Sequence, residues 1–208
     1  MVAACNPDPT TAPPPPRGAA VPAYAGRIEG VSVADLGASW RPGCPLGPGD
    51  LRRIVVAHWG YDGAVHEGQL IVATPHADAL LGVFRSLYDD RFPIERMEPV
   101  AYYGADDNRS MAANNSSAFN CRTVAGTRTW SEHAFGAAID LNPVQNPYVR
   151  GTSVSPPAGR SWSDRTSVVA GMIVAGGPVV RAFAAIGWHW GGAWRSAQDY
   201  QHFSASGR

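Results

Sequence analysis

Glycine and proline recur along the whole sequence and limit the length of any helix or strand. The 23 glycines and 18 prolines make up about one fifth of the 208 residues, above their share in an average globular protein. Such a content argues against a helical bundle or a coiled coil, because both need long uninterrupted helices. It predicts a loop-rich domain of the α+β class, in which short strands and a few helices share one core.

The first 26 residues differ from the rest of the chain. Residues 10–16 include four consecutive prolines, the composition of a polyproline II tether with almost nothing apolar to bury. Small residues precede Cys5, a pattern that resembles the end of a bacterial lipoprotein signal, where the cysteine is acylated. We therefore expect residues 1–26 to be a disordered tether with a lipid at Cys5, and residues 27–208 to form one folded domain. The alternative is an incidental cysteine in a disordered tail.

Charge and hydropathy exclude several classes of partner. Lysine and arginine number 17, as do aspartate and glutamate, so the formal net charge is zero. A dedicated nucleic-acid binder usually has a basic excess, and so does a protein held to an anionic membrane by charge. No apolar run approaches the ~18 residues of a membrane-spanning helix. We expect no nucleic-acid partner, a monomer, and membrane contact only through a lipid at Cys5.

The first half of the domain has clear strand and helix signals. Residues 54–59 are rich in β-branched side chains and predict a strand, and the glycines of residues 60–63 predict a turn. Residues 65–73 then predict a second strand, so the two strands form a hairpin. Pro75 suits the first turn of a helix, and apolar side chains recur at helical spacing from there to Asp89.

The second half is less regular. Residues 92–103 alternate loosely and predict a third strand, while residues 136–141 predict a short apolar one. Residues 178–186 predict a helix that begins at a proline and stops at a glycine. Residues 106–129 and 153–167 have no clear period and predict loops. A loop as long as the first of these usually lines a site or is disordered.

Two cysteines remain if Cys5 carries a lipid, and they pair without remainder. An export signal would bring the chain to an oxidising compartment, where a disulfide can form. We favour a bridge between Cys44 and Cys121. The other possibility is two buried free thiols.

Histidines and acidic residues gather in two segments of the sequence. A catalytic zinc needs three protein ligands and an open position for water, and two imidazoles with one carboxylate give such a set. His133, Asp140 and His202 would supply it. Asp199 is the second acid, which would take the proton from the water. It precedes His202 by three residues, so both would project from one side of a turn or helix, which we expect here.

The spacing of these residues resembles a known family. The motif consists of Ser131-x-His133-x-x-Gly136-x-Ala138-x-Asp140, followed by Asp199-x-x-His202-Phe203. It resembles the zinc D-alanyl-D-alanine carboxypeptidases of the VanY type and their relatives, the L-alanyl-D-glutamate peptidases. The likeness covers roughly residues 40–204, and residues 114–122, 139–148 and 187–192 resemble one exported subgroup. It implies one Zn²⁺ per chain and the small α+β fold shared with Hedgehog signalling domains, with an antiparallel sheet carrying the metal and helices on one face.

The resemblance implies a role for each matched residue. His133, Asp140 and His202 would be the zinc ligands, and Asp199 would be the general base and later the general acid. Ser131 would hydrogen-bond the substrate.

Three further residues are candidates for the site. An arginine upstream of the first ligand usually neutralises the developing oxyanion or a substrate carboxylate, and we prefer Arg122 over Arg109 for this role because it is nearer to His133. His189, which lies between two tryptophans, is a candidate substrate contact.

The sequence therefore predicts an exported, lipid-anchored zinc peptidase domain, which acts on peptidoglycan stem peptides at the outer face of the membrane. The preferred activity is that of a D-alanyl-D-alanine carboxypeptidase. One alternative is an L-alanyl-D-glutamate endopeptidase, since loop residues decide which bond is cut. Another is an inactive metal-bearing module that binds wall peptide or a protein, and a third is a structural lipoprotein without metal. Asp199 argues against the binding module, because such a module needs no base.

Overall fold

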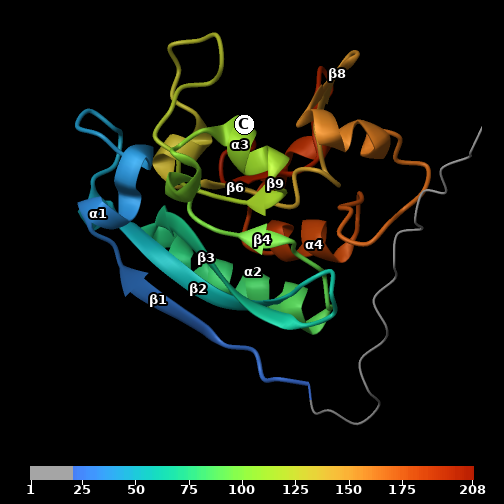
Figure 1. Ribbon diagram of the computed structural model, residues 1–208, viewed down its shortest axis with the longest axis horizontal. Helices are drawn as coiled ribbons and strands as arrows, with labels where there is room; N and C mark the ends of the chain where they lie inside the picture. Colours follow the sequence, from blue (N-terminus) through green and yellow to red (C-terminus); the bar gives the residue numbers. More distant parts are fainter. Residues whose placement is uncertain (1–20) are drawn as a thin grey trace, which may run out of the picture.

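The computed structural model describes residues 21–208 (Figure 1). The proposed lipid site at Cys5 and most of the tether therefore lie outside the described residues. Within them, no helix is long and apolar enough to cross a membrane. The helices and strands, in chain order, are β1 (Gly26–Gly30), α1 (Val33–Leu36), β2 (Leu51–Trp59), β3 (Val65–Ala73), α2 (Ala77–Asp89), β4 (Arg96–Met97), α3 (Asp107–Ala112), β5 (Asn115–Ser116), β6 (Ala138–Asp140), β7 (Tyr148–Arg150), β8 (Ser153–Ser155), α4 (Pro178–Ala184), β9 (His189–Trp190), β10 (Gln198–Asp199) and β11 (His202–Ser204).

The largest sheet is antiparallel and has the strand order β1-β2-β3. β2 and β3 pair along their whole length, from Leu51 opposite Ala73 to Trp59 opposite Val65, which confirms the predicted hairpin. The helix predicted after Pro75 is α2, whose apolar residues at helical spacing are buried against this sheet. This half of the molecule lies in the lower part of Figure 1.

The remaining strands form small sheets, of which β6, β8 and β9 are labelled in the upper part of Figure 1 and β4 beside β3. Their orders are β6-β11-β9 and β10-β7-β8, both antiparallel, and β4 pairs with β5 in parallel. The predicted class is confirmed in its coarse form, as a mixture of small antiparallel sheets and a few helices. The small antiparallel sheet β6-β11-β9 carries Asp140 and His202, which is compatible with the expected metal-bearing sheet, and the finer assignment to the Hedgehog-like fold stays a prediction.

One hydrophobic core joins the two halves. It contains residues of β2, β3, α2, α4, β6 and β11, all nearly inaccessible to solvent. Phe183 of α4 stacks on Phe203 of β11 with ring centroids 4.1 Å apart. Such aromatic pairs add to the stabilisation that comes from buried area. β11 is therefore anchored in the core by the residue that directly follows His202.

Two predictions for the middle of the chain are wrong. Residues 92–103 do not form a strand beyond the two residues of β4, because Pro93 and Pro99 lack the amide that a strand needs and a 3₁₀ turn follows at Val100–Tyr103. The loop expected at residues 106–129 contains α3 and β5. The side chain of Asp106 caps α3 by accepting hydrogen bonds from two amides of its first turn, a local signal that we did not use.

A disulfide joins Cys44 to Cys121, as the sequence favoured. The backbone beside it is held as well, since Cys121 donates its amide to the Ser39 carbonyl over 2.9 Å. Arg41 donates from Nη1 to the Cys121 carbonyl, also over 2.9 Å. These contacts hold the segment that leads into Arg122.

Gly136 allows the segment with His133 to lie directly on β3. Its φ of +56° is in the left-handed region, and a Cβ there would be 2.5 Å from the Ala73 amide nitrogen. That amide donates a hydrogen bond of 2.9 Å to the Gly136 carbonyl. Only glycine meets both conditions without strain.

We expect Gly136→Ala to lower the free energy of unfolding by about 2 kcal/mol or more, because it adds a clash with β3 to the cost of a left-handed alanine. Gly151→Ala is the matched control, since its φ of +57° is almost the same and a Cβ there meets nothing within 4 Å. Urea denaturation of both variants measures the difference. Equal losses in the two variants would show that the contact with β3 is unimportant.

Candidate metal centre

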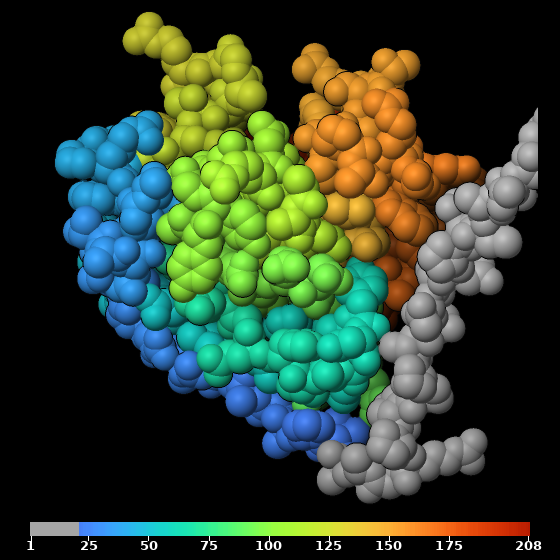
Figure 2. Space-filling view, in the orientation of Figure 1, coloured from blue at the N-terminus to red at the C-terminus, as the bar shows by residue number. Residues whose placement is uncertain are grey.

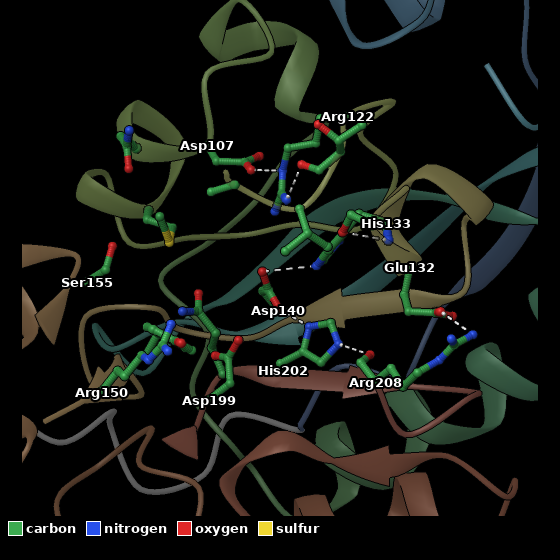
Figure 3. A pocket seen from close by; sticks show the side chains of 18 of the residues that line it. Asp107, Arg122, Glu132, His133, Asp140, Arg150, Ser155, Asp199, His202 and Arg208 are labelled. Carbon is green, nitrogen blue, oxygen red and sulfur yellow. Dashed lines mark hydrogen bonds and ion pairs between the residues drawn. The ribbon is translucent and has the colours of Figure 1, made fainter. Parts of the chain in front are cut away.

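Three side chains from two separate segments of the sequence converge at one point (Figure 3). His133 belongs to the 3₁₀ turn Glu132–Phe135, Asp140 ends β6 and His202 begins β11. One donor atom of each lies within 4.8 Å of the other two. The antiparallel pairing of β6 with β11 places His202 directly opposite Asp140.

The carboxylate of Asp140 lies between the two imidazoles. Its Oδ2 is 3.2 Å from His133 Nε2, and its Oδ1 is 2.9 Å from His202 Nδ1. All three side chains are largely buried, with exposed fractions of 5%, 14% and 7% for His133, Asp140 and His202. A charged carboxylate at such a depth needs partners of this kind.

Each imidazole has its other ring nitrogen against a backbone carbonyl. His133 Nδ1 is 2.6 Å from the Ala118 oxygen, and His202 Nε2 is 3.0 Å from the Arg208 oxygen. A backbone oxygen only accepts, so each of these nitrogens carries a hydrogen, and His133 Nε2 and His202 Nδ1 are the ring nitrogens turned toward the Asp140 carboxylate at the centre. Histidines that bind metals have this second hydrogen bond almost without exception.

The charges at the centre shift the pKa values of its members. Burial alone would raise the pKa of Asp140, but the charges and hydrogen bonds of His133 and His202 outweigh it and hold that pKa well below its usual range. Burial alone would lower the pKa of His202, but its hydrogen bond to Asp140 raises it to about 9. Asp140 is therefore ionised near neutral pH.

Asp199 enters the same cavity from β10. Its Oδ1 atom is buried and has no hydrogen-bond partner among the described residues. Burial raises the pKa of Asp199 to about 7. The carboxyl group is thus poised to exchange a proton near neutral pH, which suits a general acid or base.

The chain between Asp199 and His202 is not helical. Asp199 ends β10 and His202 begins β11, and residues 200–201 form a bend between the two strands. β10 pairs with β7 while β11 pairs with β6, so strand hydrogen bonds use the backbone groups that a helix would need. The bend still lets Asp199 and His202 face the same cavity, as the expected turn would have done.

The cavity has a volume of about 800 Å³. One wall comes from α3 and residues 122–133, and the other from β7, β8 and β10. Figure 2 shows the surface hollowed between these walls, the first in green to yellow and the second in orange. The residues that line it include the three cluster members, Asp199, Asp107, Met111, Arg122, Trp130, Ser131, Glu132, Tyr148, Arg150, Ser153, Ser155, Trp194, Gln201 and Arg208.

Of the other predicted site residues, two line the cavity and two do not. Arg122 and Ser131 line the cavity. The Ser131 hydroxyl accepts a hydrogen bond of 3.3 Å from the His133 amide, so it also shapes the turn that presents this histidine.

Arg109 and His189 lie outside the cavity, and nothing in the structure supports them as substrate contacts. Arg109 is in the last turn of α3 and reaches toward Gly104, because the helix turns its side chain away from the opening. His189 is exposed on β9 and packs beside Gly207.

Several cavity residues were missed by sequence reasoning. Asp107 and Arg150 are the clearest, because each lies in or beside a segment that we expected to be a loop. Arg150 ends β7, which with β8 forms a short hairpin at the edge of the expected loop. Strands of three residues are too short for alternation to be recognised in the sequence.

Comparison with known families agrees with the motif. Residues 125–205 match the family model described as D-alanyl-D-alanine carboxypeptidase. This confirms the resemblance to this family, and the matched segment contains His133, Asp140, Asp199 and His202. Comparison with curated proteins and with solved structures gave no significant match.

We expect Asp140→Asn to abolish the raised pKa of His202 in metal-free protein. Without the carboxylate, burial is opposed only by the smaller effects of the Asp199 charge and the Arg208 oxygen, so the pKa of His202 should fall from about 9 toward ~6.5, the ordinary value of histidine. The folded-state pKa exceeds the unfolded one, so this ion pair stabilises the metal-free fold below pH ~6.5 and its contribution is lost as the pH rises through about 9.

NMR titration of isotope-labelled histidines measures this change. His76 serves as an internal control, because burial alone lowers its pKa and it packs against Trp188 outside the cavity. An unchanged pKa of His202 in the variant would contradict the coupling.

Proposed function

We propose that this protein is a zinc-dependent peptidase that hydrolyses peptidoglycan stem peptides. We propose further that it acts as a D-alanyl-D-alanine carboxypeptidase. The main support for this proposal is the buried cluster of His133, Asp140 and His202, with Asp199 in the same cavity. The family match over the same residues supports a peptidase.

The donor set fits Zn²⁺. Two imidazole nitrogens and one carboxylate are a known catalytic set, and both imidazoles are already oriented by backbone carbonyls. His133 Nε2, one carboxylate oxygen of Asp140 and His202 Nδ1 would hold the ion. When bound, Zn²⁺ would lower the pKa of a water toward ~7 and polarise the peptide carbonyl.

Asp199 has the properties of the proton carrier. Its unpartnered Oδ1 and its pKa of about 7 allow it to accept a proton from the attacking water. The same group then returns the proton to the amine that leaves. A buried carboxyl group without a full set of partners lowers the stability of the folded protein. A role in proton transfer explains its presence, which favours an enzyme over a binding module.

Arg122 supplies positive charge on the opposite wall. Its Nε pairs with the carboxylate of Asp107, which also accepts a hydrogen bond of 2.7 Å from the Asn120 side chain. Asp107 therefore holds the guanidinium in place. A fixed guanidinium facing the reacting carbonyl would stabilise the developing oxyanion, and the Ser131 hydroxyl would contact the bound peptide.

We also propose that the protein acts outside the cytoplasm, at the cell envelope. The Cys44–Cys121 disulfide supports an oxidising compartment. Attachment through a lipid at Cys5 stays a prediction from the sequence, as does the monomeric state.

We expect the wild-type protein to hold one Zn²⁺ per chain after reloading, and His133→Ala and His202→Ala to lose it. Each removes one of three ligands, which should weaken binding by a factor of about 100 or more. Elemental analysis after dialysis measures the content. His189→Ala is the control, since this exposed histidine lies outside the cavity and should keep full zinc. A wild type without stoichiometric zinc would refute the metal site.

We expect Asp199→Asn to retain zinc and to lose about 10²–10⁴-fold in kcat, because the amide cannot accept the proton. Incubation with pentapeptide muropeptides and mass spectrometry of the products measures turnover. Loss of one terminal D-Ala identifies the carboxypeptidase, and release of a peptide that begins with D-Glu identifies the endopeptidase. No cleavage by zinc-loaded wild type would favour the binding module, and unchanged turnover in the variant would remove Asp199 from the mechanism.

A further inference from the structure

One face of the β7–β8 hairpin forms part of the cavity wall. Tyr148 and Arg150 of β7 and Ser153 and Ser155 of β8 line the cavity, whereas Val149, between the first two, does not. Successive residues of a strand point to opposite faces, so the four polar side chains share the face turned toward the site. The pairing agrees, with Arg150 opposite Ser153 and Tyr148 opposite Ser155.

Asp199 belongs to the same face. β10 pairs with β7 so that Asp199 is opposite Tyr148, and both line the cavity. Arg150 is two residues further along β7, a step of about 7 Å. Figure 3 shows Arg150 and Asp199 on the same side of the cavity, opposite Asp107 and Arg122.

Among residues 21–208, Arg150 is the arginine of the cavity lining that has no acidic partner. Three arginines line it, and two of them have acidic partners: Arg122 pairs with Asp107, and Arg208 lies 3.4 Å from Glu132. Arg150 makes no ion pair and no side-chain hydrogen bond within residues 21–208. Its guanidinium is therefore free to bind an anionic group of a ligand.

We propose that Arg150 binds the C-terminal carboxylate of the substrate and so directs cleavage to the last peptide bond. The inference rests on the proposed peptidase function. Equivalent atoms of successive residues lie at most about 4 Å apart, and an arginine–carboxylate hydrogen bond adds about 3 Å. These two distances sum to about 7 Å. The step along β7 from Tyr148, which is opposite Asp199, to Arg150 is also about 7 Å. A guanidinium binds a carboxylate through two parallel hydrogen bonds, which an uncharged amide cannot match.

The test compares two substrates on the zinc-loaded full chain. They are a diacetylated L-Lys-D-Ala-D-Ala peptide with a free C-terminus and the same peptide with a C-terminal amide. We expect the wild type to prefer the acid by about 10-fold or more in kcat/KM. Arg150→Ala should lower kcat/KM for the acid by a similar factor, mainly through KM, and leave the amide unchanged. The kcat/KM of Arg150→Lys for the acid should lie between those of the wild type and Arg150→Ala.

Arg160→Ala is the matched control. This arginine lies in the 3₁₀ helix Pro157–Trp162 that follows the hairpin, and it does not line the cavity. Arg160→Ala should leave kcat/KM unchanged for both the acid and the amide. Equal losses for acid and amide in Arg150→Ala, or no loss at all, would overturn the proposal.

A side-chain carboxylate is the other possible source of the anion. A stem peptide with D-Glu and the same peptide with D-Gln distinguish the two sources. If Arg150→Ala lowers kcat/KM for the D-Glu peptide alone, the assignment to the C-terminal carboxylate is overturned. If the wild type cleaves neither short peptide with zinc bound, the peptidase function fails. Calorimetric binding of acid and amide then decides separately whether Arg150 recognises the terminal carboxylate: tighter binding of the acid, lost in Arg150→Ala, supports it, and equal binding overturns it.

Discussion

The pairing of β6 with β11 is the interaction on which the centre depends. It sets His202 opposite Asp140, although 61 residues separate them in the sequence. Phe203, the next residue of β11, is fully buried and stacks on Phe183 of α4. Side chains alternate along a strand, so anchoring Phe203 in the core turns His202 to the opposite face, toward the cavity.

The centre brings polar groups into a place where they are costly unless paired. Asp140 is compensated by two imidazoles, and each imidazole by a backbone carbonyl. Within residues 21–208, the Oδ1 atom of Asp199 has no hydrogen-bond partner and Arg150 has no acidic partner. The structure thus separates groups that hold the site together from groups that remain available to a substrate.

The sequence predicted the fold best where its signals were local and long. The β2–β3 hairpin and α2 follow from β-branched runs, turn glycines and helical spacing. The prediction failed for residues 92–103, where prolines interrupt a loosely alternating segment. It also missed α3 and the β7–β8 hairpin, because elements of three to six residues are stabilised by contacts with the rest of the molecule more than by their own pattern.

For the site, the sequence by itself determined the candidates for the chemistry: the two histidines, Asp140 and Asp199 form a spaced motif of donors and acids. Their spacing in the chain says nothing of the other wall. Only the tertiary structure decided that the β7–β8 hairpin faces them, that Asp107 holds Arg122, and that Arg109 and His189 lie outside the cavity. The physical reason is that a donor type is a property of one residue, whereas a cavity wall depends on which strands pair across long loops, and short strands leave no readable trace of that pairing in the sequence.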